Sequence, residues 1–91
     1  MGVHKTIFLP PLEKEETAGY LYGQGANLIH EHNGDIDAIP NFKEAAQQTA
    51  RNLIQSYDDD HTDLGYPEWI NGKIIELNLN GRGIEYVFIG E

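Results

Sequence analysis

Acidic side chains are concentrated in one short segment of the chain, DDDHTD, at residues 58–63. Loops rich in oxygen ligands suit Ca²⁺ or Mg²⁺, and the EF-hand pattern requires Gly at its sixth position and Glu at its twelfth. Counted from Asp58, those positions hold Asp63 and Trp69, so the pattern fails. The simplest interpretation is a solvated acidic connector. Carboxylates this close repel one another, which favours an open loop unless a cation or a basic partner binds there.

Histidine is the second residue type that could bind a metal in this chain. His30-Glu31-His32 forms one cluster, and His61 lies within the acidic segment. Two His two residues apart face one side of a strand but point about 200° apart on a helix. The HExxH zinc pattern needs a spacing of four. If the clusters meet in space, a mixed His/Asp metal site results, with candidate ligands His30, His32, His61 and Asp60.

Enzymatic motifs are otherwise missing from the sequence. There is no Cys, and Ser56 is the only serine and has no G-x-S-x-G context. Gly23-Gln24-Gly25 begins like a dinucleotide-binding fingerprint but lacks the third Gly and follows no strand. Close helix packing explains these glycines better. The sequence therefore favours a protein without enzymatic activity or cofactor.

Aromatic residues lie directly beside the acidic segment. Tyr66, Glu68 and Trp69 follow it, and Tyr and Trp are enriched in binding hot spots. An acidic rim with aromatic anchors is typical of a protein-binding surface, although Trp69 capping the core is the alternative. The predicted partner-binding residues are Asp58, Asp59, Asp60, Asp63, Tyr66, Glu68 and Trp69.

The charge of the whole chain narrows the choice of partner. Fifteen acidic residues against six basic ones give a formal net charge of −9. Direct nucleic-acid binding requires Lys and Arg to displace phosphate counterions, so it is disfavoured, as is an anionic membrane. A basic protein is the natural counterpart. The lack of Cys favours the cytoplasm, and no apolar stretch is long enough to span a bilayer.

The first half of the chain predicts one strand and two helices. Residues 4–9 alternate as a strand that Pro10-Pro11 ends. Apolar residues recur at helical spacing over residues 12–32, where glycines predict a bend or an interruption. The alternative there is a break followed by a hairpin across Asn33-Gly34. Residues 41–57 give the clearest helix, with a capping box formed by Asn41 and Glu44 and a buried stripe of Phe42, Ala46, Thr49, Ala50, Leu53, Ile54 and Tyr57.

Residues 68–89 predict three consecutive antiparallel strands after a polar loop over residues 58–67. Asn71-Gly72 is a strong hairpin signal, and Ile75, Leu77 and Leu79 then share one face. The fold class is α+β, with one domain over residues 1–91. Its element order is β-α-α-β-β-β, an antiparallel sheet with two helices packed on one face. The last strand, 84–89, is apolar on both faces, and Thr6–Leu9 is the expected cover.

Three functional hypotheses follow from these patterns. The leading one is a small acidic binding protein that sequesters or inhibits a basic, nucleic-acid-binding partner, as phage-type inhibitors do by presenting carboxylates in place of phosphates. The second is a metal-binding or metal-dependent enzyme built on the His and Asp clusters. The third is a structural module that self-associates through its C-terminal strand.

Overall fold

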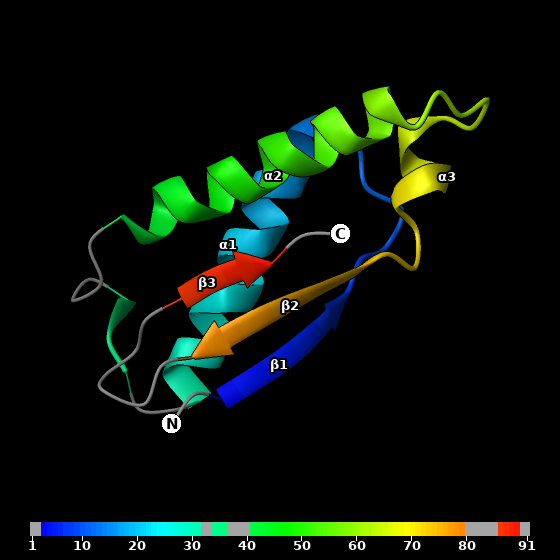
Figure 1. Cartoon of the computed structure of the whole chain (residues 1–91). Helices are drawn as coiled ribbons and strands as arrows, with labels where there is room; N and C mark the ends of the chain where they lie inside the picture. Colours follow the sequence, from blue (N-terminus) through cyan, green and yellow to red (C-terminus); the bar gives the residue numbers. More distant parts are fainter. Residues whose placement is uncertain (1–2, 32–33, 37–40, 80–85, 90–91) are drawn as a thin grey trace.

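A computed structural model describes residues 3–31, 34–36, 41–79 and 86–89, which form three helices and an antiparallel sheet (Figure 1). The predicted α+β class is confirmed. No helix in these ranges is long and apolar enough to cross a membrane. In chain order the elements are β1 (Val3–Phe8), α1 (Lys14–Glu31), α2 (Phe42–Asp59), α3 (Tyr66–Ile70), β2 (Ile74–Leu79) and β3 (Tyr86–Ile89).

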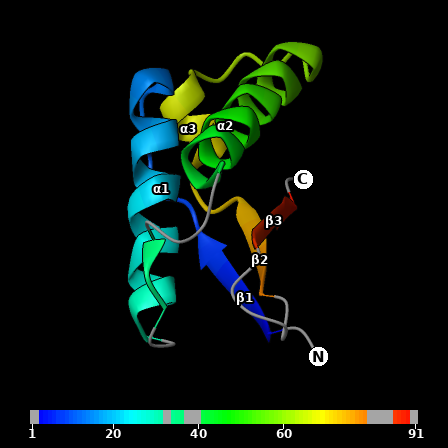
Figure 2. The ribbon, with the colours of Figure 1, turned by 90° about the vertical axis from the view of Figure 1, so that its left-hand side faces the viewer.

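The sheet has the order β1-β2-β3, and both pairings are antiparallel. Ile7 stands opposite Ile75 and both are buried, whereas the next pair, Phe8 and Ile74, is 65% and 40% exposed. This alternation confirms the predicted period of two in β2 near Ile75. Figure 2 shows the helices gathered on one side of the sheet. The predicted cover of the last strand by Thr6–Leu9 is wrong, because β1 pairs with β2 instead.

The predicted hairpin at Asn71-Gly72 is also wrong, because α3 takes the place of its first strand. Pro67 lies in the first turn of α3, where its missing N–H has no helical partner to lose. The Asn-Gly turn exists, with φ of +81° at Gly72, but it joins a helix to a strand. Gly72 donates to the carbonyl of Leu9 over 2.8 Å, and Leu9 N–H donates to the carbonyl of Lys73 over 2.9 Å. The element order is therefore β-α-α-α-β-β.

The helix favoured over residues 12–32 is confirmed as α1. Of the predicted bend or interruption at its glycines, the interruption is wrong, and the alternative hairpin is wrong because Leu28–Glu31 are helical. Glu13 N–H donates to the Glu16 carboxylate over 2.8 Å, which satisfies a free donor at the start of the helix. The buried stripe includes Gly25, where a Cβ would lie 2.3 Å from Cζ of Phe42. Close packing against α2 thus explains Gly25. Beyond the end of α1, Gly34 N–H donates to the carbonyl of Ile29 over 2.9 Å.

Helix α2 follows the predicted stripe but not the predicted cap. Asn41 has a left-handed backbone, with φ of 67°, and its side chain makes no capping hydrogen bond. A capping side chain requires extended backbone at that position, so the capping box with Glu44 is wrong. The predicted stripe is confirmed: its first five residues are buried, and the last two are partly buried against the core.

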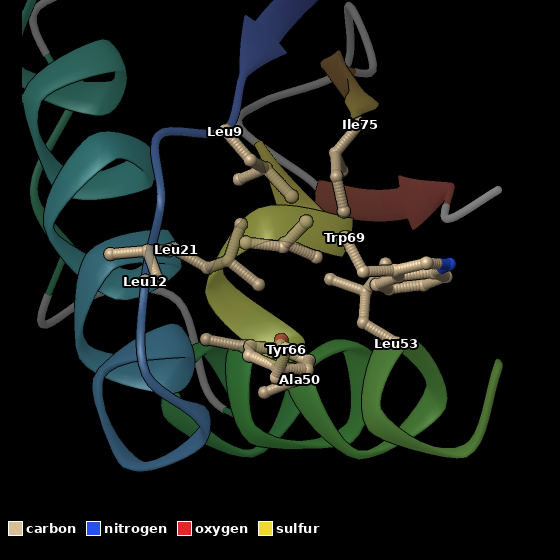
Figure 3. Packing of buried hydrophobic residues seen from close by; sticks show 10 residues of the cluster. Leu9, Leu12, Leu21, Ala50, Leu53, Tyr66, Trp69 and Ile75 are labelled. Atoms are coloured by element: carbon tan, nitrogen blue, oxygen red, sulfur yellow. The ribbon is translucent and has the colours of Figure 1, made fainter. Parts of the chain in front are cut away.

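The core lies where the three helices meet one end of the sheet (Figure 3). Helix α3 contributes its three buried residues to this core: Tyr66, Trp69 and Ile70. A five-residue helix cannot be stable alone, so its position depends on this packing. The cluster consists of Leu9, Leu12, Leu21, Ala46, Ala50, Leu53, Tyr66, Trp69, Ile70 and Ile75.

Candidate functional site

The predicted acidic loop is partly helical in the structure. Helix α2 extends to Asp59, and the N–H of Asp60 donates to the carbonyls of Ser56 and Tyr57 over 3.0 and 3.2 Å. Asp58 and Asp59 therefore occupy the last turn, which contains no basic residue. The negative end of the helix dipole disfavours carboxylates at this position. These two side chains are exposed and oppose the stability of the helix that carries them.

An aromatic cluster of Tyr57, Tyr66 and Trp69 supports the acidic segment. The Tyr57 ring centroid lies 5.4 Å from those of both Tyr66 and Trp69, in edge-to-face geometry. The Tyr57 hydroxyl donates to the carbonyl of Leu64 over 2.6 Å. Trp69 Nε1 donates to Oδ2 of Asp60 over 2.8 Å. The connector is thus tied to the core at both of its ends.

The two predicted aromatic anchors belong to the core rather than to an exposed surface. Tyr66 is 4% exposed and Trp69 is 8% exposed. The Tyr66 hydroxyl is hydrogen-bonded to Oγ1 of Thr17 over 2.8 Å, and burial raises the Tyr66 pKa while this bond acts in the opposite direction. Both rings therefore pack in the core, and of the two only Trp69 also lines a surface pocket. Glu68 and the four aspartates remain exposed.

Helix α1 contributes acidic residues that sequence reasoning did not connect to this site. The Lys14 ammonium lies 5.4 Å from the Tyr57 ring centroid, and Thr17 contacts Tyr66, so the start of α1 lies beside the end of α2. Only the antiparallel packing of these helices could have revealed this. We call the resulting surface the acidic end: Glu13, Glu15, Glu16, Asp58, Asp59, Asp60, Asp63 and Glu68, all exposed.

A pocket of about 350 Å³ opens within the acidic end, lined by Ser56, Asp59, Asp60, Trp69 and Lys73. The Lys73 ammonium lies 4.4 Å from the Trp69 ring centroid, within the range of a cation–π contact. Carboxylates, a hydroxyl and an aromatic ring together suit an ammonium or a guanidinium group. Lys73 shows that a cation is accommodated beside this ring.

Among the residues that the structure describes, the candidate metal ligands do not come together. No group of three or more His, Asp or Glu residues suited to an ion occurs in the described ranges. His30 is sixteen residues beyond Lys14 on α1, roughly 24 Å along the helix from the acidic end, where His61 and Asp60 lie. The mixed site is therefore wrong for His30. His32 lies outside the described residues.

Comparisons with known proteins found no match: no family profile, no curated protein sequence and no solved structure matches the chain.

Proposed function

We propose that this protein is a small acidic binding protein, without enzymatic activity, that contacts a basic protein partner through the acidic end. The observation that carries the proposal is the position of Asp58 and Asp59. Both are exposed in the last turn of α2, where the helix dipole disfavours them and no basic side chain of that turn compensates. Side chains that oppose the stability of their own helix are better explained by binding than by folding.

The pocket supplies a specific contact for one basic side chain of the partner. An arginine of the partner enters beside Asp59 and Asp60, and its guanidinium displaces the Lys73 ammonium from the Trp69 ring. Paired N–H donors suit carboxylate oxygens, which makes arginine a better occupant than lysine. The surrounding carboxylates raise the rate of encounter through long-range attraction.

The finer proposal is that the partner is a nucleic-acid-binding protein, and that the carboxylates of the acidic end occupy the sites of phosphates. The support is the sign and the concentration of the charge. Eight of the fifteen acidic residues belong to the acidic end. Proteins that bind nucleic acid display basic surfaces of the complementary sign. A phage-type inhibitor is one class of protein that works this way.

The direct test compares two variants of equal charge. One carries Asp58→Asn, Asp59→Asn and Asp63→Asn, and it leaves Asp60 in place because that side chain binds Trp69. The matched control carries Glu31→Gln, Glu44→Gln and Glu76→Gln, three exposed sites outside the acidic end. We expect an arginine-rich peptide, and any partner captured from lysate, to bind the first variant at least tenfold more weakly than the control.

The affinities of the same two variants can also overturn the proposal. Equal loss of affinity in both would mean that total charge, rather than the acidic end, governs binding. Undiminished binding by the first variant would remove the acidic end from the interface altogether. An affinity that does not fall as salt is added would also contradict the mechanism, because exposed charges are screened within about 10 Å at 0.1 M salt.

Self-association is a second candidate, favoured by the exposed apolar pair on the open face of the sheet. Phe8 and Ile74 stand opposite each other and are 65% and 40% exposed. A second copy that covered this face would remove both from water. Light scattering decides the question: a dimeric mass that Phe8→Lys converts to a monomeric one supports it, and a monomeric mass of the unaltered protein rejects it.

A further inference from the structure

A groove of about 330 Å³ lies between α1 and α2, at the opposite end of α2 from its aspartates. Its lining consists of Ala18, Gly19 and Tyr22 from α1 with Lys43 and Gln47 from α2. Small-molecule sites are commonly clefts of roughly 300 to 1,000 Å³ with mostly apolar walls and a few polar groups. The groove falls at the lower end of this range, and its described lining includes no residue of the acidic end.

The floor of the groove is helix backbone. A Cβ added at Gly19 would meet no atom within 4 Å, so the packing of the described chain does not require Gly there. Glycine inside a helix is unfavourable relative to alanine. Its effect here is to leave a flat, uncovered surface beside Ala18. A planar group can lie against this surface without meeting a side chain.

Tyr22 forms one wall, and its ring is held in place by a neighbour. The Tyr22 and Phe42 centroids lie 5.3 Å apart, and Phe42 is buried, whereas Tyr22 is 38% exposed. The ring therefore has a fixed position and an accessible side. Aromatic groups pack favourably against such a ring in offset or edge-to-face geometry.

The opposite side of the groove carries the polar groups. Lys43 is exposed, and Gln47 lies one helical turn further along α2. An ammonium and an amide at this spacing can both donate to one carboxylate. Lys43 is the one cationic residue among the described residues of the lining, so it sets the sign of the charge that fits beside them.

We propose that this groove binds a small aromatic monocarboxylate. The aromatic ring lies on the backbone at Gly19 and against Tyr22, and the carboxylate accepts hydrogen bonds from the ammonium of Lys43 and the amide of Gln47. An aromatic ligand without the carboxylate loses the contact with the Lys43 ammonium. A dianion gains nothing further, because the described lining offers no second cation.

The probe for this proposal is 2-naphthoate, titrated into ¹⁵N-labelled protein and followed by amide chemical shifts. We expect saturable shifts confined to the groove segments around Gly19 and Lys43. The neutral analogue 2-naphthalenemethanol, and separately the Lys43→Gln variant with 2-naphthoate, should bind about tenfold more weakly. Equal affinity for acid and alcohol, or shifts spread over the aromatic cluster instead, would overturn the proposal.

Two glycine variants separate binding from stability. Gly19→Ala and Gly23→Ala both remove an unfavourable helical glycine, and neither Cβ meets an atom within 4 Å, so both should raise the melting temperature. Only Gly19 lines the groove. Gly19→Ala should therefore weaken 2-naphthoate binding about fivefold or more while Gly23→Ala leaves it unchanged. Identical affinities in the two variants would contradict a ligand lying on the Gly19 backbone.

Discussion

Trp69 connects the charged surface of the protein to its interior. Its ring packs in the core among Leu53 and Ile75, while Nε1 at the edge of that cluster donates to Asp60 (Figure 3). Lys73 covers part of the ring from outside. The same side chain thus orders the connector after α2 and forms the wall of the acidic pocket, so its two roles can be separated only by a conservative change.

Trp69→Phe is that change, because it keeps an aromatic ring but removes the donor to Asp60. We expect it to lower the free energy of unfolding by about 1 to 2 kcal/mol, near the lower range for a hydrogen bond to a charged acceptor, since Asp60 is exposed and regains water. Urea denaturation measures the loss.

A double-mutant cycle with Asp60→Ala isolates this hydrogen bond. A coupling energy near zero between the two substitutions would show that the loss comes from ring packing alone.

Tyr66 predicts a dependence of stability on alkaline pH. Burial raises its pKa above the ordinary value of 10.0 in the folded state. The folded protein therefore holds this proton more tightly than the unfolded chain, and the stabilisation is complete below pH 10 and lost as pH rises through the folded pKa. We expect the free energy of unfolding to decline above about pH 10.

Tyr66→Phe identifies the source of that decline. It should cost about 1 kcal/mol at neutral pH, through loss of the hydrogen bond to Thr17, and should flatten the alkaline decline. Urea denaturation at about pH 8 and pH 11 measures both effects. An unchanged decline in this variant would assign the alkaline sensitivity to other groups.

At the scale of elements, α1 and α2 depend on one close approach. A Cβ at Gly25 would lie 2.3 Å from Cζ of the buried Phe42 ring, which also packs against Tyr22. We expect Gly25→Ala to destabilise the protein by about 1 to 3 kcal/mol despite the higher helix propensity of alanine, because the ring must move. Thermal unfolding measures the effect.

Gly23→Ala is the matched control for Gly25→Ala and should be stabilising. Adding Phe42→Leu to Gly25→Ala should recover part of the loss, because the smaller side chain leaves room for the new methyl group. A stabilising Gly25→Ala variant would refute the close approach of the two helices.

The long elements could be predicted from the sequence, whereas the short one could not. Apolar spacing identified α1 and α2 because eighteen residues repeat the helical period many times. The segment YPEWI is one turn long, so it carries no period, and the Asn-Gly that follows suggests a hairpin. Pro67 in the first turn was the signal for a helix.

The candidate site was partly predictable for the same reason. Its aspartates adjoin one another in sequence, but Glu13, Glu15 and Glu16 join them only through the packing of α1 on α2. Exposure of Tyr66 and Trp69 was a tertiary property that local sequence does not determine.

At the scale of the whole molecule, the charge distribution makes stability depend on salt. Eight carboxylates share the acidic end, where the nearby cations Lys14 and Lys73 lie over aromatic rings. Added salt screens the mutual repulsion of these carboxylates. We expect the melting temperature to rise between about 20 mM and 300 mM NaCl, with a smaller rise in the Asp58→Asn, Asp59→Asn, Asp63→Asn variant, as scanning calorimetry would measure.

The triple variant should also be more stable than the unaltered protein at low salt, by about 0.3 to 1 kcal/mol for each carboxylate removed from the end of α2. Its matched control, changed at Glu31, Glu44 and Glu76, should keep the full salt response. A melting temperature that falls as salt is added would contradict repulsion at the acidic end.

The pairing of β1 with β2 has a consequence for the order in which the protein is made. Phe8 pairs with Ile74, and the backbone of Leu9 is hydrogen-bonded to that of Gly72 and Lys73. Strand β1 therefore cannot pair until these later residues have been synthesised. Helices α1 and α2 are complete and able to pack on each other before that point. During translation the nascent chain therefore carries an unpaired strand beside two packed helices, a stage at which a ribosome-associated chaperone has a defined segment to protect.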